Sequence, residues 1–276
     1  MIDNSLESAC GTARNILGDV LAEVKSAAGF ILDSKQGFHA GHVEFKGAGN
    51  LVSFVDRGAE KMLMEGLSKF LPHAGFLGEE GSKLNPDADY RWIVDPLDGT
   101  TNFMHGLPHY AISVALQFRG MTVLGVVEDI EARQTYHAVL GDGAWCGGKR
   151  LEVSQTGNLA HSLLCMGFPY PDGGFSLDAY MSVLRSFVQT TRGMRRLGAA
   201  ALDLAWVASG KLDGFYEWGL QPWDVAAAAL LIQEAGGCVS DFHGGDDYVF
   251  GRQLVASSPL LHSQMLSVIR PHFSNP

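Results

Sequence analysis

One stretch, WIVDPLDGTTNF at residues 92–103, organises the rest of the chain. Its apolar start, Trp92 to Val94, is typical of a buried strand. Pro96 predicts the end of that strand, because proline lacks a backbone N–H and fixes its own φ. Asp98 is a good helix N-cap, and Gly99 lets the backbone approach a ligand closely. The pattern therefore predicts a strand, a sharp turn and a helix, with two carboxylates beside the helix N-terminus.

Carboxylates bind hard cations, whereas a helix N-terminus attracts an anion. A metal-bridged phosphate is the simplest ligand that uses both features. The aspartates of an isolated Asp-Pro-x-Asp-Gly are also ordinary turn and cap residues. Two further acidic segments favour the metal site. Glu79 and Glu80 follow a short apolar strand predicted at 75–77, and Asp224 lies in the first turn of an apolar helix that opens at Pro222.

Together these segments resemble the signature motifs of the inositol monophosphatase family, the Mg²⁺-dependent, lithium-sensitive phosphomonoesterases. The resemblance covers roughly residues 6–269. It rests on residues 92–103, on Gly78-Glu79-Glu80, and on Trp223-Asp224-Val225-Ala226-Ala227 followed by Glu234-Ala235-Gly236-Gly237. It implies an α+β fold, a layered αβαβα sandwich. Residues 1–276 would form one domain, with approximate halves at 1–150 for metal and phosphate and at 151–276 for the substrate.

Composition and charge argue against some classes of protein function. A chain that is 46% hydrophobic is expected to be globular, and the net charge of −10 argues against direct nucleic-acid binding. An anionic substrate would then need bound cations beside it. We find no signal peptide, no apolar run of membrane-spanning length and no zinc-site spacing among the cysteines. We therefore expect a cytoplasmic protein with reduced thiols and no membrane contact. The four cysteines are Cys10, Cys146, Cys165 and Cys238.

Hydrophobic periodicity predicts the other elements. The first half has a long amphipathic helix, a polar loop or hairpin, a second helix and an antiparallel meander, at residues 6–31, 35–49, 54–70 and 110–139. In the second half strands alternate with helices, which predicts a parallel or mixed sheet covered by helices. Those strands are predicted at 162–168, 213–218, 238–240 and 254–257, and the helices at 176–189, 199–209, 259–269 and from residue 222 onward. The glycine-rich segment 141–148 indicates hairpin turns, and Pro108 argues against a metal site made of His105 and His109.

The resemblance also implies a metal-ligand set for two Mg²⁺ ions. The first ion would be held by Glu79, Asp95 and the backbone carbonyl of Leu97. The second would share Asp95 and add Asp98 and Asp224. A third, weaker ion near Glu79 is an open alternative. In such two-metal sites the ions activate a water and stabilise the leaving oxygen.

Further roles follow from the same resemblance. The backbone N–H groups of Gly99 and Thr100 would hold the phosphate, and the Thr100 hydroxyl, oriented by Asp56, would hold the attacking water. Asp98, Ala200 and Glu217 would contact the leaving group, since a carboxylate accepts from the hydroxyls of a sugar or inositol. Lys46 in the polar loop, and Arg195 and Arg196, are either anion contacts or solvated surface charges.

We therefore expect an enzyme that hydrolyses myo-inositol monophosphates to inositol and phosphate with a metal-activated water, and the family implies a homodimer. The metal-binding motifs do not distinguish among the possible phosphate-ester substrates. Fructose 1,6-bisphosphate, histidinol phosphate and adenosine 3′,5′-bisphosphate remain alternatives, although the acidic Glu217 side favours a polyol. Some bacterial relatives act as accessory factors of transcription, so a protein-binding module with residual phosphatase activity is a further alternative.

Overall fold

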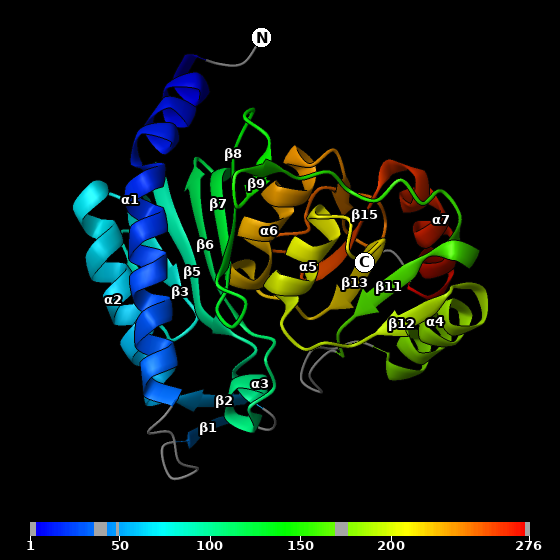
Figure 1. The fold of residues 1–276 in the computed structure, drawn as a ribbon. Helices are drawn as coiled ribbons and strands as arrows, with labels where there is room; N and C mark the ends of the chain where they lie inside the picture. Colours follow the sequence, from blue (N-terminus) through cyan, green and yellow to red (C-terminus); the bar gives the residue numbers. More distant parts are fainter. Residues whose placement is uncertain (1–3, 36–42, 48–49, 169–175, 274–276) are drawn as a thin grey trace.

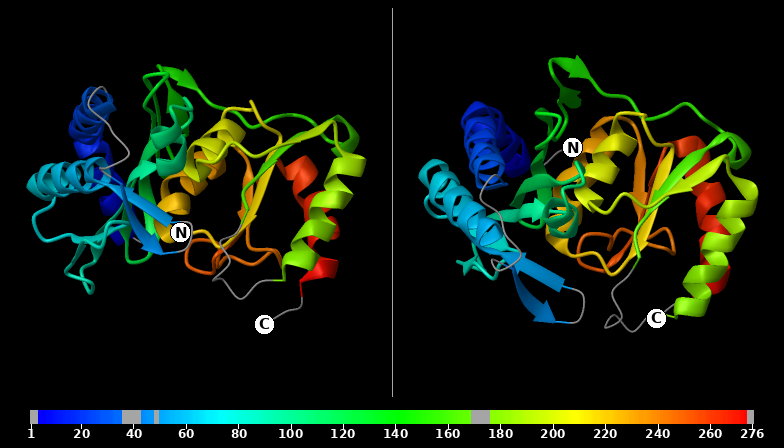
Figure 2. Two further views of the ribbon diagram at one scale, coloured as in Figure 1. Left: turned by 90° about the horizontal axis from the view of Figure 1, so that it is seen from below. Right: turned by 60° about the horizontal axis from the view of Figure 1, so that its bottom comes forward.

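The computed structural model describes residues 4–35, 43–47, 50–168 and 176–273, with the backbone alone at 43–47 and 50–53. Five layers stack in the order helices, sheet, helices, sheet, helices (Figure 1). The helical layers are α1 (Asn4–Lys35) with α2 (Phe54–Phe70), α5 (Ala200–Ala208) with α6 (Pro222–Glu234), and α4 (Leu177–Thr190) with α7 (Pro259–Ile269). Figure 2 shows the first and last pairs on opposite flanks. The expected αβαβα sandwich is confirmed.

The first sheet has eight strands in the order β10-β9-β8-β7-β6-β5-β3-β4. Only β3 and β5 pair in parallel, and the meander predicted at 110–139 is confirmed as β6, β7 and β8. Trp92, Val94 and Val114 belong to the core shared with α1 and α2, whereas Ile93 and Ala115 belong to the core shared with α5 and α6. The strands are β3 (Gly75–Gly78), β4 (Lys83–Leu84), β5 (Tyr90–Asp98), β6 (Ala111–Phe118), β7 (Met121–Asp129), β8 (Gln134–Val139), β9 (Ala144–Cys146) and β10 (Lys149–Arg150).

The central strand β5 corrects one prediction. It does not end at Pro96 but continues to Asp98. Its pairing with β6 shifts between Asp95, opposite Ser113, and Asp98, opposite Ala111. Two residues of β5 thus face one residue of β6, as in a β-bulge, and proline is accepted where the hydrogen-bond ladder is already interrupted.

Small residues let α6 lie very close to the first sheet. Ala115, Gly125 and Ala138 are cross-strand neighbours on β6, β7 and β8. A Cβ atom at Gly125 would lie 2.5 Å from the carbonyl oxygen of Ala227, which no real side chain could tolerate. The backbones of β7 and α6 are therefore in direct contact, and glycine at 125 fixes their spacing.

The second sheet is mixed, as predicted, with the order β12-β11-β13-β15-β14. The first three strands are parallel and the last two pairings are antiparallel. The strands are β11 (Leu163–Met166), β12 (Gly193–Arg195), β13 (Gly214–Trp218), β14 (Cys238–Ser240) and β15 (Gln253–Ser257). Sequence analysis missed β12 because three residues reading Gly-Met-Arg carry no strand periodicity.

The smaller elements agree with the expected turns. The polar segment after α1 contains an antiparallel hairpin of β1 (Val43–Gly47) and β2 (Asn50–Ser53), while residues 36–42 and 48–49 of the expected loop lie outside the described residues. Strands β9 and β10 form the predicted hairpin around Gly147 and Gly148. Short 3₁₀ helices lie at Leu159–His161 and Arg270–His272. Among the described residues, no helix combines the length and the apolar character needed to cross a membrane.

Candidate active site

Three carboxylates from two distant parts of the chain meet at one end of the first sheet. Asp95 and Asp98 lie at the end of β5, and Asp224 lies in the first turn of α6. Each offers an oxygen within 4.8 Å of the other two. Asp95 and Asp98 are only 2% and 8% exposed. The close approach of α6 to the sheet therefore carries Asp224 to the two acids of the central strand.

The three acids, called the acid cluster below, all have pKa values above the ordinary value of an aspartate. Burial is the largest cause for each, and it brings the pKa of Asp98 to about 6. The pKa of Asp95 is held well above its ordinary value by burial and by the negative charges of Glu79, Asp98 and Asp224. Burial and the negative charges of Asp98 and Glu79 raise the pKa of Asp224 well above its ordinary value. Desolvated carboxylate oxygens this close together suit a divalent cation such as Mg²⁺.

Glu79 flanks the acid cluster. It follows β3 directly, is half-buried, and its N–H donates to the carbonyl of Val94 at 3.2 Å. Glu79 is not one of the three acids that lie within 4.8 Å of one another. After burial, its charge is nevertheless the largest cause of the raised pKa of Asp95. The structure thus brings Glu79 to the Asp95 side of the cluster.

A polar chain connects α2 to the acid cluster through α3 (Thr100–His105). The Thr100 hydroxyl lies 2.9 Å from Oδ1 of Asp56, which is 1% exposed, and 3.0 Å from the carbonyl of Leu97. The N–H of Leu97 donates to Oδ1 of Asp95 at 2.9 Å. A hydroxyl has one proton, and the Asp56 carboxylate is the stronger acceptor. When the hydroxyl donates to Asp56, its lone pairs can accept from another donor.

Asp98 corrects a second prediction, since it does not cap the helix that follows it. The N-cap of α3 is Gly99, at φ +90°. A side chain at residue 99 would also lie 3.0 Å from Cβ of Ala199. The Asp98 carboxylate instead accepts from the N–H of Ala201 at 2.7 Å, in the first turn of α5. Asp98 therefore serves a helix that has no capping side chain of its own and links the first sheet to α5.

The residues of the predicted substrate side, besides Asp98, lie on α5 and on β13 of the second sheet. Ala200 is the first residue of α5. Glu217 on β13 is half-buried, and its carboxylate packs on Gly167, where a Cβ would lie 2.1 Å from it. Burial and the charges of Asp224 and Asp203 hold the pKa of Glu217 well above its ordinary value, against the opposing charge of Arg196. Glu217 is therefore not an ordinary exposed strand end.

Among the basic candidates, Arg196 lies near the substrate side, since its charge acts on Glu217 and a Cβ atom at Gly198 would lie 2.6 Å from its guanidinium. Arg195 and Arg196 are both exposed, and Arg195 donates to the carbonyl of its neighbour Met194. The side chain of Lys46 lies outside the described residues.

The sequence matches the Inositol monophosphatase family over residues 3–273. The chain belongs to this family. It is therefore a phosphatase of the inositol monophosphatase type, and its αβαβα sandwich is the fold of its relatives.

Individual relatives of this family cover almost the whole chain. A protein named Nus factor SuhB from Pseudomonas aeruginosa is 42% identical over 261 residues, which is 93% of this chain and 96% of the relative. An inositol-1-monophosphatase from Mesorhizobium japonicum is 40% identical over 264 residues, 95% of this chain and 99% of the relative. The crystal structure of the extragenic suppressor protein SuhB from Bartonella henselae superimposes with a TM-score of 0.87 at 36% identity, covering 93% of this chain and 98% of that one.

Two buried acids near the site were not anticipated from the sequence. Asp203 on α5 is 2% exposed and lies 2.7 Å from Nε2 of His109, whose ring stands edge-on to Trp206. The pairing partners are 94 residues apart, so no local pattern indicates them. His109 thus has a carboxylate partner, and His105 is exposed. Glu60 on α2 is also 2% exposed, and its position one helical turn after Asp56 is the signal that was available.

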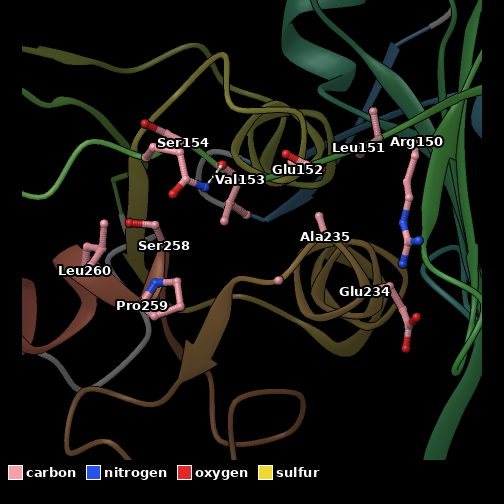
Figure 3. Close-up of a pocket in the computed structure, with 12 residues that line it drawn as sticks. Arg150, Leu151, Glu152, Val153, Ser154, Glu234, Ala235, Ser258, Pro259 and Leu260 are labelled. Atoms are coloured by element: carbon pink, nitrogen blue, oxygen red, sulfur yellow. Dashed lines mark hydrogen bonds between the residues drawn. The ribbon is translucent and has the colours of Figure 1, made fainter.

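A separate pocket of about 530 Å³ opens at the other end of α6. Figure 3 shows Arg150 and Glu234 at one end of it and Ser258 and Leu260 at the other. Asp224 and Glu234 are ten residues apart on one helix, so the pocket lies about 15 Å from the acid cluster along the helix axis. None of its lining residues belongs to the site described above. The lining residues are Arg150, Leu151, Glu152, Val153, Ser154, Gln155, Glu234, Ala235, Gly236, Ser258, Pro259 and Leu260.

Proposed function

We propose that the chain hydrolyses phosphate monoesters of myo-inositol, with Mg²⁺ held by the acid cluster. The observation that carries the proposal is the convergence of Asp95, Asp98 and Asp224 at the strand end beside the Thr100–Asp56 pair. The name of the Mesorhizobium relative, inositol-1-monophosphatase, supports the choice of substrate.

The donor set fits two Mg²⁺ ions. We assign Glu79, Asp95 and the carbonyl of Leu97 to one ion, and Asp95, Asp98 and Asp224 to the other. A third, weaker ion would lie near Glu79. All of these donors are oxygens, which Mg²⁺ prefers. Bound Mg²⁺ would act as a Lewis acid on the phosphate and lower the pKa of a coordinated water.

The chain itself holds and orients the reactants in this proposal. Asp56 accepts the Thr100 proton, so the Thr100 oxygen accepts from the attacking water and fixes its direction. The backbone N–H groups of Gly99 and Thr100 hold the phosphate, and Gly99 has the left-handed backbone conformation, at φ +90°, that glycine adopts most readily. The half of the chain to about residue 150 thus carries most of the chemistry, and α6 adds Asp224 from the other half.

The leaving group is contacted mainly by residues outside the first sheet. Asp98, Ala200 and Glu217 border the space opposite the first sheet. Alcohol hydroxyls are donors, and carboxylate oxygens accept from them. Vicinal hydroxyls of inositol would satisfy two such acceptors, whereas the anionic second phosphate of a bisphosphate would meet repulsion from them. This arrangement favours a polyol monophosphate.

A panel of substrates tests the proposal. The purified protein is assayed with inositol 1-phosphate, fructose 1,6-bisphosphate, histidinol phosphate and adenosine 3′,5′-bisphosphate, each with Mg²⁺ and with EDTA. We expect the highest kcat/KM for inositol 1-phosphate and no turnover in EDTA. A higher kcat/KM for one of the other esters would refute the assigned substrate, and turnover in EDTA would refute the metal mechanism.

A second candidate function rests on the Pseudomonas relative, whose name marks it as a Nus factor. In this alternative the chain is a protein-binding accessory of transcription that retains phosphatase activity. The net charge of −10 favours a protein partner over direct nucleic-acid contact. An antitermination assay with the wild type and with Asp95→Asn separates the two roles, because only a binding role survives loss of the metal site. We also propose that the protein is a homodimer and is located in the cytoplasm. All four cysteines are free thiols, which agrees with a reducing compartment.

A further inference from the structure

Helix α2 presents two buried acids, one turn apart, to two different segments of the site. Asp56 and Glu60 are 1% and 2% exposed. Asp56 contacts Thr100, as described above. Glu60 reaches the turn between β3 and β4, which begins directly after Gly78 and carries Glu79. One helix therefore supports both the water-orienting threonine and the segment of a proposed metal ligand.

The Glu60 carboxylate spans this turn. Its Oε2 atom accepts from the N–H of Glu80 at 2.8 Å, and its Oε1 atom accepts from the N–H of Ser82 at 3.2 Å. A Cβ atom at Gly78 would lie only 2.2 Å from Oε2, so glycine at 78 makes room for the carboxylate. The N–H of Gly78 in turn donates to the carbonyl of Ser82 at 2.9 Å, which closes the turn.

Glu79 is thus fixed on both sides along the chain. Its own N–H donates to Val94 on β5, and the next N–H, of Glu80, donates to Glu60. Both oxygens of Glu60 are used as acceptors, which a carboxylate provides and an amide does not. An amide would keep one acceptor and turn an NH₂ group toward the other N–H, and a buried donor facing a donor is unfavourable.

We propose that Glu60 is a positioning residue that sets the Mg²⁺ affinity of the Glu79 side of the site. It holds the turn so that the Glu79 carboxylate stays beside Asp95. The inference rests on the proposed function for the assignment of Glu79 as a metal ligand. Groups that orient metal ligands in this way typically change metal affinity 10- to 100-fold when they are removed.

The test compares Glu60→Gln with the wild type and with Glu128→Gln. Glu128 is a matched control, because it is also a buried glutamate, 3% exposed, and lies on β7 of the first sheet. Mg²⁺ binding is measured by calorimetry and by the Mg²⁺-induced rise in Tm, and kcat is measured at saturating Mg²⁺. For Glu60→Gln we expect the Kd for Mg²⁺ to rise about tenfold or more, with kcat at saturation changed much less. Glu128→Gln should bind Mg²⁺ like the wild type.

A second variant keeps the inference testable if Glu60→Gln does not fold. Gly78→Ala displaces the Glu60 carboxylate without changing any charge, and it should weaken Mg²⁺ binding in the same direction. Wild-type Mg²⁺ affinity in the folded variants would overturn the inference, as would an equal loss in Glu128→Gln. Failure of the proposed function is distinguishable from this result. In that case the wild type would hydrolyse none of the esters, yet the Mg²⁺ titrations would still report on Glu60.

Discussion

Replacing Asp95 by asparagine should make the metal-free protein more stable and the Mg²⁺-bound protein less stable. Two unit charges at the upper limit of 4.8 Å that separates these oxygens repel by about 3–4 kcal/mol at an effective dielectric constant of about 20. Asp95 faces two such charges, on Asp98 and Asp224, and the charge of Glu79 adds to them. Proton uptake by the cluster, which the raised pKa values reflect, already relieves part of this repulsion at neutral pH. We therefore expect Asp95→Asn to add about 1–3 kcal/mol to the free energy of unfolding without metal.

The side chain of asparagine keeps the contact of residue 95 with the main chain, because its Oδ1 can still accept from the N–H of Leu97. Charge is thus the main difference between the two proteins. With Mg²⁺ at about 100 times its Kd, binding stabilises the wild type by about 2.7 kcal/mol. The variant loses a ligand shared by both proposed ions and should gain little. The order of stability should reverse between the two conditions.

Urea unfolding in EDTA and in saturating Mg²⁺ measures both effects. The matched control is Asp129→Asn, which changes a 5% exposed aspartate on β7 that accepts from the N–H of Ala132 outside the cluster. The control should show no reversal. If Asp95→Asn were the less stable protein in EDTA, the repulsion argument would be wrong. If Mg²⁺ stabilised it as much as the wild type, Asp95 would not be a ligand.

Four further predictions concern catalysis, packing, pH and inhibition. Thr100→Val should lower kcat about 100-fold or more with Mg²⁺ affinity unchanged, and Thr100→Ser should recover most of it; equal activity of all three proteins would exclude the hydroxyl from the reaction. His109→Ala removes the histidine partner of the buried Asp203 carboxylate, which then keeps the weaker bond from the Cys165 thiol. The variant should cost about 3 kcal/mol in urea unfolding, part of which Asp203→Asn should restore in the double variant. Because the pKa of Asp98 in the folded protein is raised to about 6, the folded protein holds a proton on Asp98 more tightly than the unfolded chain does. In EDTA the stability of the wild type relative to Asp98→Asn should therefore fall as the pH rises from about 4 through 6, and a constant difference would contradict this. LiCl should inhibit uncompetitively at millimolar concentration, and inhibition no greater than that by KCl at the same ionic strength would show that this property of the family is absent.

Local chemistry explains what sequence analysis predicted. Apart from β12, the elements of the second sheet and its helices follow from apolar periodicity and from turn residues, so their predicted bounds agree closely with the structure. The strand–turn–helix around Gly99 was predicted because glycine and aspartate have strong local preferences. The meeting of Asp224 with Asp95 had no local signal. It was expected only because the separate motifs resemble those of one family.

What could not be predicted depends on packing between distant segments. Pro96 lies inside a strand because the neighbouring strand shifts its register at that point. Asp98 is a residue type that often caps helices, but Gly99 is the N-cap of α3. The Asp98 carboxylate accepts a hydrogen bond from a different helix, α5. Glu60 and Asp203 look like ordinary helix acids in the sequence. Their burial and their partners appear only when α2 meets the β3–β4 turn and α5 meets His109.

The contact of Gly125 with Ala227 makes the position of Asp224 depend on how closely β7 packs against α6. A methyl group at residue 125 would meet the carbonyl oxygen of Ala227, and α6 would have to move outward as a rigid rod. Asp224 lies less than one turn away from Ala227 on that rod and would move with it. Residue 125 lies on β7, two strands away from β5 in the sheet. In a genetic screen, a loss of cation binding could thus map to a position in the sheet that offers no ligand.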